Sequence, residues 1–203
     1  MNKEKGKNNI KMILIGESGV GKTNLMNVAM NKDFDPNIAS SNHSSFLEGK
    51  LLYKNKDYFY SLWDTAGQEM YRALNKIFIK GAKIIICVYA IDSKDSFEQL
   101  EYWINYAKET LEDDKYIMAI LGNKSDLFED QEVPEEDLEN LAKKYNCKFI
   151  ITSAMEDANG VKKFFNQLII DYIDLVGPEA DKILNFKLHE SKKNEKGKKK
   201  KFC

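Results

Sequence analysis

The stretch Gly-Glu-Ser-Gly-Val-Gly-Lys-Thr at residues 16–23 directly follows the apolar run Ile-Lys-Met-Ile-Leu-Ile at residues 10–15. A Gly-x-x-x-x-Gly-Lys-Thr loop between a strand and a helix is typical of a phosphate-binding loop. Its glycines let the backbone wrap a polyphosphate, and successive N–H groups then face the anion at the positive end of the next helix. A glycine turn that only connects a strand to a helix is the alternative, but it requires neither the Lys nor the Thr. The stretch therefore predicts that the chain binds a nucleoside triphosphate.

Two side chains at the end of this loop carry its chemistry. Lys22 can reach the β- and γ-phosphates, so we expect it to be catalytic, and the Thr23 hydroxyl can ligate Mg²⁺. The residues of this region that we expect to contact the nucleotide are Glu17, Ser18, Gly19, Val20, Gly21, Lys22, Thr23 and Asn24.

Strand-like and helix-like patterns alternate along the chain after this loop. Strands are predicted at residues 10–15, 46–53, 58–63, 84–89, 116–121 and 149–151, and helices at 23–30, after 93–95, from Pro134, and over a last apolar stripe that ends at 177–178. Residues 54–57 are predicted to turn a hairpin. This order predicts the α/β class: a six-stranded, mostly parallel sheet with one antiparallel edge strand and helices on both faces. Ligands of such sheets bind at the carboxyl ends of the strands.

The charge is uneven along the 203 residues, because residues 191–203 hold seven Lys and one Glu while the whole chain has a net charge of −1. The acidic remainder makes nucleic acid a poor partner. We expect a flexible N-terminus at 1–9, a nucleotide-binding domain at 10–176 and a lysine-rich tail at 177–203. No apolar run is long enough to span a membrane, and no secretory signal is expected. Cys87 and Cys147 are predicted to fill the core rather than to form disulfides.

A second motif, Asp-Thr-Ala-Gly-Gln-Glu at residues 64–69, follows the strand that ends in Trp63. Asp64 is placed to hold Mg²⁺ through water, opposite Thr23. The Gly67 N–H can approach a γ-phosphate, and Gln68 is placed to orient an attacking water, so we expect Gln68 to be catalytic. Alone, the string could be a turn rich in capping residues.

A third motif, Asn123-Lys124-Ser125-Asp126, follows the strand at 116–121. The Asp126 carboxylate can accept two hydrogen bonds from the N1–H and the 2-amino group of guanine, a donor pair that adenine lacks, so Asp126 predicts selection of GTP over ATP. Asn123 and Lys124 are expected to contact the nucleotide with it, the Lys124 stem covering the base. Residues 152–154, Thr-Ser-Ala, follow the last strand and could meet the guanine O6.

Together these motifs resemble the Ras superfamily of small GTPases, and within it the Rab branch, over roughly residues 9–175. Residues 63–69, Lys80-Gly81-Ala82 and Val88-Tyr89 are similar to the Rab pattern. The resemblance implies GTP and GDP as the bound nucleotides, Mg²⁺ as cofactor, and a slow GTPase that an activating protein stimulates. It also implies a monomeric switch in vesicle trafficking that cycles between the cytosol and the cytoplasmic face of an intracellular membrane. An exchange factor, an activating protein and effectors would be its partners.

The resemblance also assigns roles by position. Phe34 would stack on guanine, and Ser153, Ala154 and Met155 would contact the nucleotide, although Met155 replaces a Lys that often follows Ser-Ala. Phe46, Trp63 and Phe78 match the aromatic surface that Rabs present to effectors; ordinary packing is the alternative. Ser41 stands where the family has a Thr that ligates Mg²⁺ and binds the γ-phosphate. Residues 42–45 lack the apolar anchors that are usual there, which suggests a looser first switch and an unusual choice of effectors.

The tail resembles a membrane tether. Lysines attract anionic lipid headgroups, and a prenyl group on Cys203 would supply the second signal that stable anchoring needs. Rabs usually end in two cysteines or a Cys-a-a-X box, whereas this sequence has a single Cys203, so an unmodified solubilising tail is the alternative.

Two other functions remain open from the sequence. A nucleotide-bound adaptor that does not cycle is suggested only by the degenerate first switch. An ATP-dependent kinase conflicts with Asp126 and with the lack of a separate acceptor site.

Overall fold

A computed structural model describes residues 9–38, 45–65, 72–111 and 115–177. Among these residues six strands form one sheet in the order β2-β3-β1-β4-β5-β6. The strands are β1 (Ile10–Ile15), β2 (Ser45–Tyr53), β3 (Lys56–Asp64), β4 (Ile84–Ala90), β5 (Ile117–Asn123) and β6 (Lys148–Ile151). Only β2 is antiparallel to its neighbour, so the predicted sheet with one antiparallel edge strand is confirmed.

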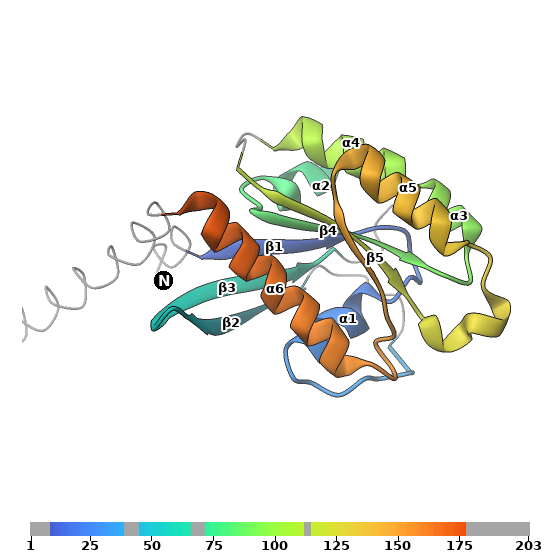
Figure 1. Ribbon diagram of the computed structural model, residues 1–203, viewed down its shortest axis with the longest axis horizontal. Coiled ribbons are helices and arrows are strands. Elements are labelled where there is room, and N and C mark those ends of the chain that lie inside the picture. The colour runs from blue at the N-terminus through green and yellow to red at the C-terminus, as the bar shows by residue number, and fades with distance from the viewer. Residues whose placement is uncertain (1–8, 39–44, 66–71, 112–114, 178–203) are drawn as a thin grey trace, which may run out of the picture.

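Helices cover both faces of the sheet, as predicted (Figure 1). They are α1 (Lys22–Ala29), α2 (Arg72–Ile79), α3 (Lys94–Glu98), α4 (Leu100–Thr110), the 3₁₀ segment η2 (Ser125–Asp130), α5 (Glu135–Tyr145) and α6 (Ala158–Val176). α1 and α6 pack on one face around a core that includes Leu25, Leu121 and Leu168. The other face carries α2 to α5 around a second core that includes Trp103 and Leu138. Among the described helices, none has both the length and the hydrophobicity that crossing a bilayer requires.

The central strand β4 is buried at every residue, which explains why it reads as an unbroken apolar run. Its neighbours β1 and β5 pair with it in parallel, Ile13 with Ile85 and Ile86 with Ala119. Parallel pairing brings the carboxyl ends of β1, β4 and β5 to the same edge of the sheet, where the sequence motifs lie.

The β2–β3 hairpin is tighter than the four-residue turn predicted at 54–57, and that prediction is corrected. Lys56 and Asp57 belong to β3 and pair with Tyr53 and Leu52. Only Lys54 and Asn55 form the turn, both with positive φ (49° and 59°). Two-residue turns of this kind match the twist of the strands they join.

Several helix boundaries differ from the prediction. The helix expected after 93–95 is divided at Gln99 into α3 and α4, and Ser93 caps α3 by accepting a hydrogen bond from the Ser96 N–H at 3.3 Å. Pro134 is the N-cap of α5 and not its first residue. α2 and η2 were not predicted. The remaining ends match the prediction or shift by one or two residues: β1 is as predicted, and α6 ends before Gly177 as expected.

Both described cysteines are free thiols, in agreement with the prediction. Cys87 is fully buried, and burial raises the pKa of its thiol well above the usual value. Cys147 is partly buried and packs against the second core, and desolvation raises the pKa of its thiol to about 11. Burial therefore favours the protonated form of both thiols, which is the less nucleophilic form.

Candidate functional site

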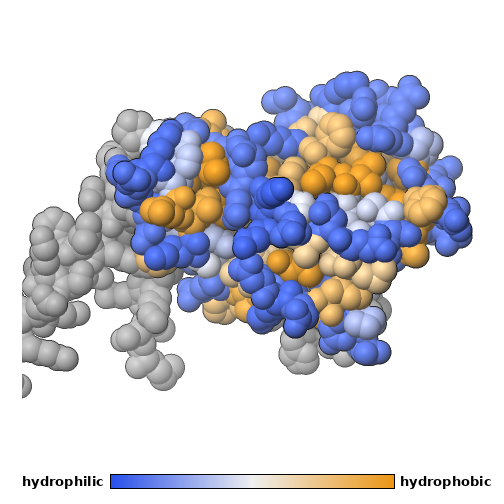
Figure 2. Space-filling model, turned by 60° about the horizontal axis from the view of Figure 1, so that its bottom comes forward, coloured by the Kyte–Doolittle hydropathy of each residue, from blue (hydrophilic) through white to orange (hydrophobic). Residues whose placement is uncertain are grey.

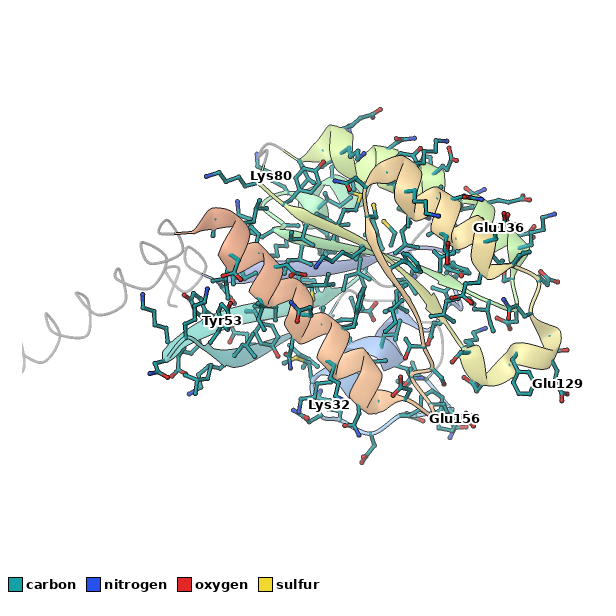
Figure 3. The ribbon with its side chains drawn as sticks, viewed as in Figure 1. Lys32, Tyr53, Lys80, Glu129, Glu136 and Glu156 are labelled. Carbon is teal, nitrogen blue, oxygen red and sulfur yellow. The ribbon has the colours of Figure 1, made fainter. Side chains whose placement is uncertain are left out.

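The first motif, the third motif and the described start of the second, Asp64 and Thr65, meet at the carboxyl-terminal edge of the sheet. Glu156 and Glu129 mark this end of the molecule in Figure 3, with Tyr53 of the hairpin at the opposite end. A cavity here is lined by Ser18, Gly19, Gly21, Lys22, Thr23, Asn24, Phe34, Ile38, Asn123, Lys124, Asp126, Ala154 and Met155. Twelve of these thirteen residues were expected from the sequence to contact a nucleotide. Ile38 was not predicted; it lies in a segment with no motif.

The loop at residues 16–23 is pressed against the central strand. Gly16 has a φ of 146°, and a Cβ atom there would lie 2.1 Å from the Val88 carbonyl oxygen. Gly21 has a φ of 92°, and its Cβ would lie 2.3 Å from Nδ2 of Asn123. A side chain at either position would push the loop out of place, so the glycines are required by close approach as well as by backbone conformation.

Lys22 lies at the start of α1 and is only 5% exposed. Its Nζ donates hydrogen bonds to the carbonyl oxygens of Gly16 (2.8 Å) and Glu17 (2.7 Å). The loop therefore bends around the ammonium group, and Lys22 also lines the cavity. A buried cation beside the N-terminus of a helix favours an anionic ligand.

Thr23 in the first turn of α1 and Asp64 at the end of β3 come together. The Thr23 hydroxyl donates a 2.6 Å hydrogen bond to Oδ2 of Asp64, which is 1% exposed at the end of β3. Thr65 next to it donates a 2.9 Å hydrogen bond to the Leu14 carbonyl oxygen and so holds this end of β3 against β1. A hydroxyl and a carboxylate are oxygen donors of the kind that Mg²⁺ prefers, and phosphate and water usually complete its shell. The pair fits the predicted Mg²⁺ site.

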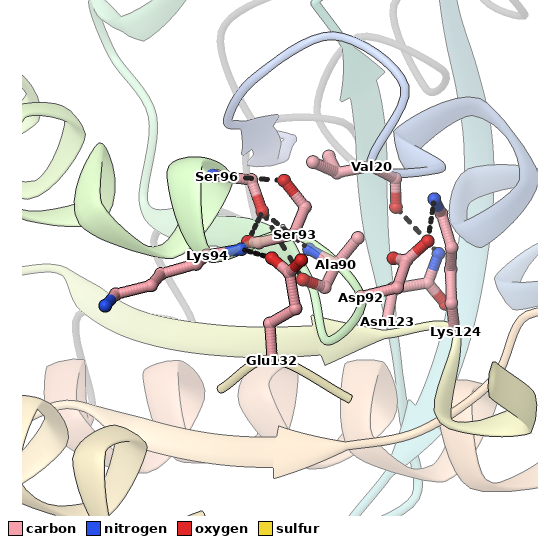
Figure 4. Close-up of polar contacts among 9 residues, drawn as sticks. All are labelled: Val20, Ala90, Asp92, Ser93, Lys94, Ser96, Asn123, Lys124 and Glu132. Carbon is pink, nitrogen blue, oxygen red and sulfur yellow. Dashed lines mark hydrogen bonds and ion pairs between the residues drawn. The ribbon is translucent and has the colours of Figure 1, made fainter. Parts of the chain in front are cut away.

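Asn123 ties the first and third motifs together (Figure 4). Its Nδ2 donates to the Val20 carbonyl oxygen at 2.8 Å, and its Oδ1 accepts from the Ala154 N–H at 3.1 Å. The side chain is 2% exposed, so both amide groups are satisfied within the protein. Asn123 thus fixes the loop at residues 16–23 relative to the segment at residues 152–154.

Lys124 and Asp126 follow Asn123 at the far end of the cavity. Lys124 has a left-handed backbone (φ 67°), and its Nζ lies 3.2 Å from Oδ2 of Asp92 in a partly buried ion pair (Figure 4). Ser153 donates from Oγ to Oδ1 of Asp126, and the same Oγ accepts from the N–H groups of Met155 (3.1 Å) and Glu156 (3.0 Å). The Asp126 carboxylate is therefore held in a fixed orientation at the cavity wall.

Three expected contact residues are near the cavity without lining it. Val20 is buried and accepts from Asn123, and Ser153 is 1% exposed behind Asp126. Glu17 presents its carbonyl to Lys22, while its carboxylate accepts a hydrogen bond from Nε1 of Trp103 at 3.0 Å. Ser41, Gly67, Gln68 and Cys203 lie outside the described residues, and their roles stay predictions.

Phe34 lines the cavity and is partly buried against the core of α1 and α6, a position compatible with stacking on a base. Asn24 holds the following segment in place by a reciprocal pair of 3.0 Å hydrogen bonds with the backbone of Asp35. The segment that carries Phe34 is therefore anchored to α1.

The predicted aromatic surface is assembled away from the cavity, from β2, β3 and α2. Phe46 stacks on Trp63 with ring centroids 4.6 Å apart, and Trp63 lies 6.4 Å from Phe78. Phe46 is 50% exposed, so its ring packs on Trp63 and also remains accessible at the protein surface. Lys11 lies with its Nζ 5.0 Å from the Trp63 ring, and desolvation lowers the pKa of its ammonium group. On the face shown in Figure 2, hydrophobic patches are separated by hydrophilic residues.

Sequence reasoning missed two residues that contact site residues, Asp92 and Trp103. Asp92 comes two residues after β4 and pairs with Lys124, and Trp103 of α4 binds Glu17. Asp92 lies at the carboxyl edge of the sheet, which was a usable signal. Trp103 gave no signal, because it occupies a core position in a helical stripe.

Comparisons with known proteins agree with this geometry. The Ras family model matches residues 11–174. "Ras-related protein Rab-11C" of Dictyostelium discoideum is 34% identical over 86% of this chain and 77% of its own length. "Ras-related protein Rab-11B" of the same organism is 39% identical over 78% and 71%, and "Ras-related protein Rab-22A" of Canis lupus familiaris is 33% identical over 85% of each chain. The family match covers most of the described fold and all three motifs, so the chain belongs to the Ras family and is a Rab-like small GTPase.

Proposed function

We propose that this chain binds GTP and GDP with Mg²⁺, hydrolyses GTP slowly, and acts as a membrane-associated switch in vesicle trafficking. The observation that carries the proposal is one cavity lined by Lys22, Thr23 and Asp126, with Asp64 hydrogen-bonded to Thr23. Each group suits a different part of the ligand: the phosphates, the metal and the guanine base.

In this proposal the protein contributes position and charge. Lys22 and the N–H groups of the loop at 16–23 take up negative charge that develops on the phosphates. Thr23 and Asp64 would hold Mg²⁺, which would supply positive charge to the phosphates. Gln68 orients the attacking water, and Ser41 supplies a hydroxyl and an N–H to the first switch. The loop and the first switch contain no arginine, so an activating protein would add one, for roughly 10³–10⁵-fold acceleration.

Single-turnover hydrolysis of GTP and of ATP in the presence of Mg²⁺ tests the proposal. We expect slow release of phosphate from GTP and none from ATP. Tight GTP binding without hydrolysis, with or without a cell extract containing activating proteins, would favour the non-cycling adaptor, which the first-switch sequence Asn-His-Ser-Ser at 42–45 suggests. Preference for ATP would contradict the role of Asp126.

Gln68→Leu should lower intrinsic GTP hydrolysis by about 10-fold or more, because the leucine cannot orient water. Nucleotide affinity should change little, since the role of Gln68 is limited to the attacking water. Single-turnover phosphate release and GTP affinity measured on the same preparation separate these effects. Unchanged turnover would remove Gln68 from the intrinsic mechanism.

Asn123→Ala should speed GDP release by about 10²-fold, because it leaves the Val20 carbonyl and the Ala154 N–H, both close to the cavity, without their buried partner. Dissociation of a fluorescent GDP analogue measures the effect. Asn105→Ala is the matched control, since Asn105 is exposed on α4 and its side-chain amide donates an exposed hydrogen bond to the Tyr145 hydroxyl, away from the cavity residues. Equal release rates for the two variants would contradict the bridging role of Asn123.

The tail carries the membrane part of the proposal. Each lysine of residues 191–203 near an anionic leaflet would contribute on the order of 1 kcal/mol, and a geranylgeranyl group on Cys203 would add stable anchoring. Mass spectrometry of the protein from its native cells tests the modification. A free Cys203 thiol throughout the population would remove the lipid and leave the lysines alone. Effectors, an exchange factor and an activating protein are the expected partners of an otherwise monomeric chain.

A further inference from the structure

The loop at residues 16–23 contains an acidic side chain, although its expected ligand, a polyphosphate, is also negatively charged. Glu17 follows Gly16 at the start of the loop, in the same turn that holds the Lys22 ammonium. A carboxylate in this turn repels the several negative charges of a nucleotide's phosphates. A second conflict is closer still, because Nζ of Lys22 lies 2.7 Å from the Glu17 backbone carbonyl oxygen. A free Glu17 carboxylate could reach the same ammonium and compete with phosphate for it.

The structure holds this carboxylate in a different place. Oε1 of Glu17 accepts a hydrogen bond of 3.0 Å from the indole Nε1–H of Trp103, and Glu17 is not among the described residues that line the cavity. Trp103 lies on α4, in the core on the side of the sheet opposite to α1 and Lys22. The bond thus draws the carboxylate across the sheet edge, away from the helix whose N-terminus faces the cavity.

Trp103 is well suited to hold an anion in a fixed position. Its side chain is 2% exposed, and Tyr102 and Tyr106 pack edge-on against its ring at 5.3 and 6.3 Å. The ring therefore cannot turn without disturbing the core. Hydrogen bonds to a charged acceptor are stronger than those between neutral groups, and the indole supplies this one without neutralising the carboxylate.

We propose that Trp103 is a positioning residue for nucleotide binding, which keeps the Glu17 carboxylate clear of the phosphates and of Lys22. The inference rests on the proposed binding of guanine nucleotides. Trp103 is not among the described residues that line the cavity, so it would act on the nucleotide through Glu17. Its effect on affinity should therefore disappear when residue 17 carries no charge.

A pair of matched backgrounds tests this dependence. Trp103→Phe, which removes the N–H donor, is made in the natural chain and in Glu17→Gln, and release of fluorescent GDP and GTP analogues is measured. With Glu17 present, release should accelerate on the order of tenfold, more for the triphosphate, because repulsion grows with phosphate charge. In the Glu17→Gln background the same substitution should change release by less than about twofold.

A purely structural role of Trp103 predicts a different result. If Trp103 acted only by filling the core, Trp103→Phe would change release equally in both backgrounds. In the proposal, loss of buried volume lowers the melting temperature of both Trp103→Phe proteins by a similar amount, while only the protein with Glu17 releases nucleotide faster. Leu138→Ala removes volume from the same core without touching the loop and should leave release near that of the natural chain. Equal acceleration in both backgrounds, or none in either, would overturn the proposal.

A second route removes only the N–H group, in case Trp103→Phe does not fold. Benzothienylalanine, a sulfur analogue that keeps the bicyclic shape, is incorporated for tryptophan in a Trp63→Phe protein with and without Glu17→Gln. Faster release only with Glu17 supports the proposal, and the absence of this difference overturns it. Failure of the natural chain to bind any guanine nucleotide would instead refute the proposed function, and the inference with it.

Discussion

Asp126→Asn is expected to reverse the base preference of this protein, from guanine to xanthine nucleotides. A carboxylate only accepts hydrogen bonds, which suits the N1–H and the 2-amino group of guanine. An amide accepts at one atom and donates at the other, which suits the N1–H and the 2-carbonyl oxygen of xanthine. Sites built to hydrogen-bond a ligand reject a mismatched one by about 10⁴–10⁵-fold, so GTP affinity should fall by that order and XTP affinity should rise.

The structure makes this substitution a conservative one. Ser153 donates to Oδ1 of Asp126, and the Asn oxygen can accept the same bond, so the amide should take the place of the carboxylate with a defined orientation. Competition binding of GTP and XTP measures the reversal. Glu156→Gln, which removes an exposed charge near the same end of the cavity, is the control and should leave both affinities unchanged. A loss of GTP binding without a gain for XTP would mean that Asp126 does not read the base.

Lys22→Met should weaken GTP binding by about 10²–10⁴-fold. The methionine keeps an unbranched, apolar stem of similar size but removes the ammonium group. Two hydrogen bonds between charged groups, one to each of two phosphates, are each worth about 1.5–3 kcal/mol, which sets this range. Titration with a fluorescent GTP analogue measures the affinity, and single-turnover hydrolysis measures the loss of transition-state stabilisation.

Lys50→Met is the control for the loss of a positive charge. Lys50 pairs with Asp57 at 3.0 Å on an exposed part of the hairpin, and surface pairs of this kind contribute about 0–1 kcal/mol. It should bind GTP as the natural chain does. If Lys22→Met kept GTP affinity within about threefold of the natural chain, Lys22 would have no direct contact with the phosphates.

The sheet and most of the cavity could be predicted because their signals are local. The buried strand at 84–90 reads as an apolar run, and the loop at 16–23 is recognised from glycine, Lys and Thr at fixed spacing. Parallel strands then carry Asp64 and Asn123 to one edge without further information. The start of β3 could not be predicted in this way. Lys56 and Asp57 are polar residues beside a turn, and only their pairing with β2 places them in the strand.

Features that depend on distant contacts could not be predicted. α2 is only eight residues long, and Ile77 on it is 70% exposed, so an apolar residue in this segment does not by itself mark a core position. The pairing of Glu17 with Trp103 joins residues 86 positions apart, and Asp92 meets Lys124 across 32. No fixed sequence spacing marks either pair. The packing of α4 brings Trp103 to Glu17, and the adjacent ends of β4 and β5 bring Asp92 to Lys124.

The close approach of Gly16 to β4 has a consequence for suppressor genetics. At Gly122 an added methyl group would meet the Tyr89 side chain at 2.7 Å, so a smaller residue at position 89 could restore the fit. At Gly16 the obstacle is the backbone carbonyl of Val88, which every amino acid carries. A screen for second-site revertants should therefore recover partners for Gly122→Ala among changes at residue 89. For Gly16→Ala the same screen should recover only reversion of residue 16 to glycine.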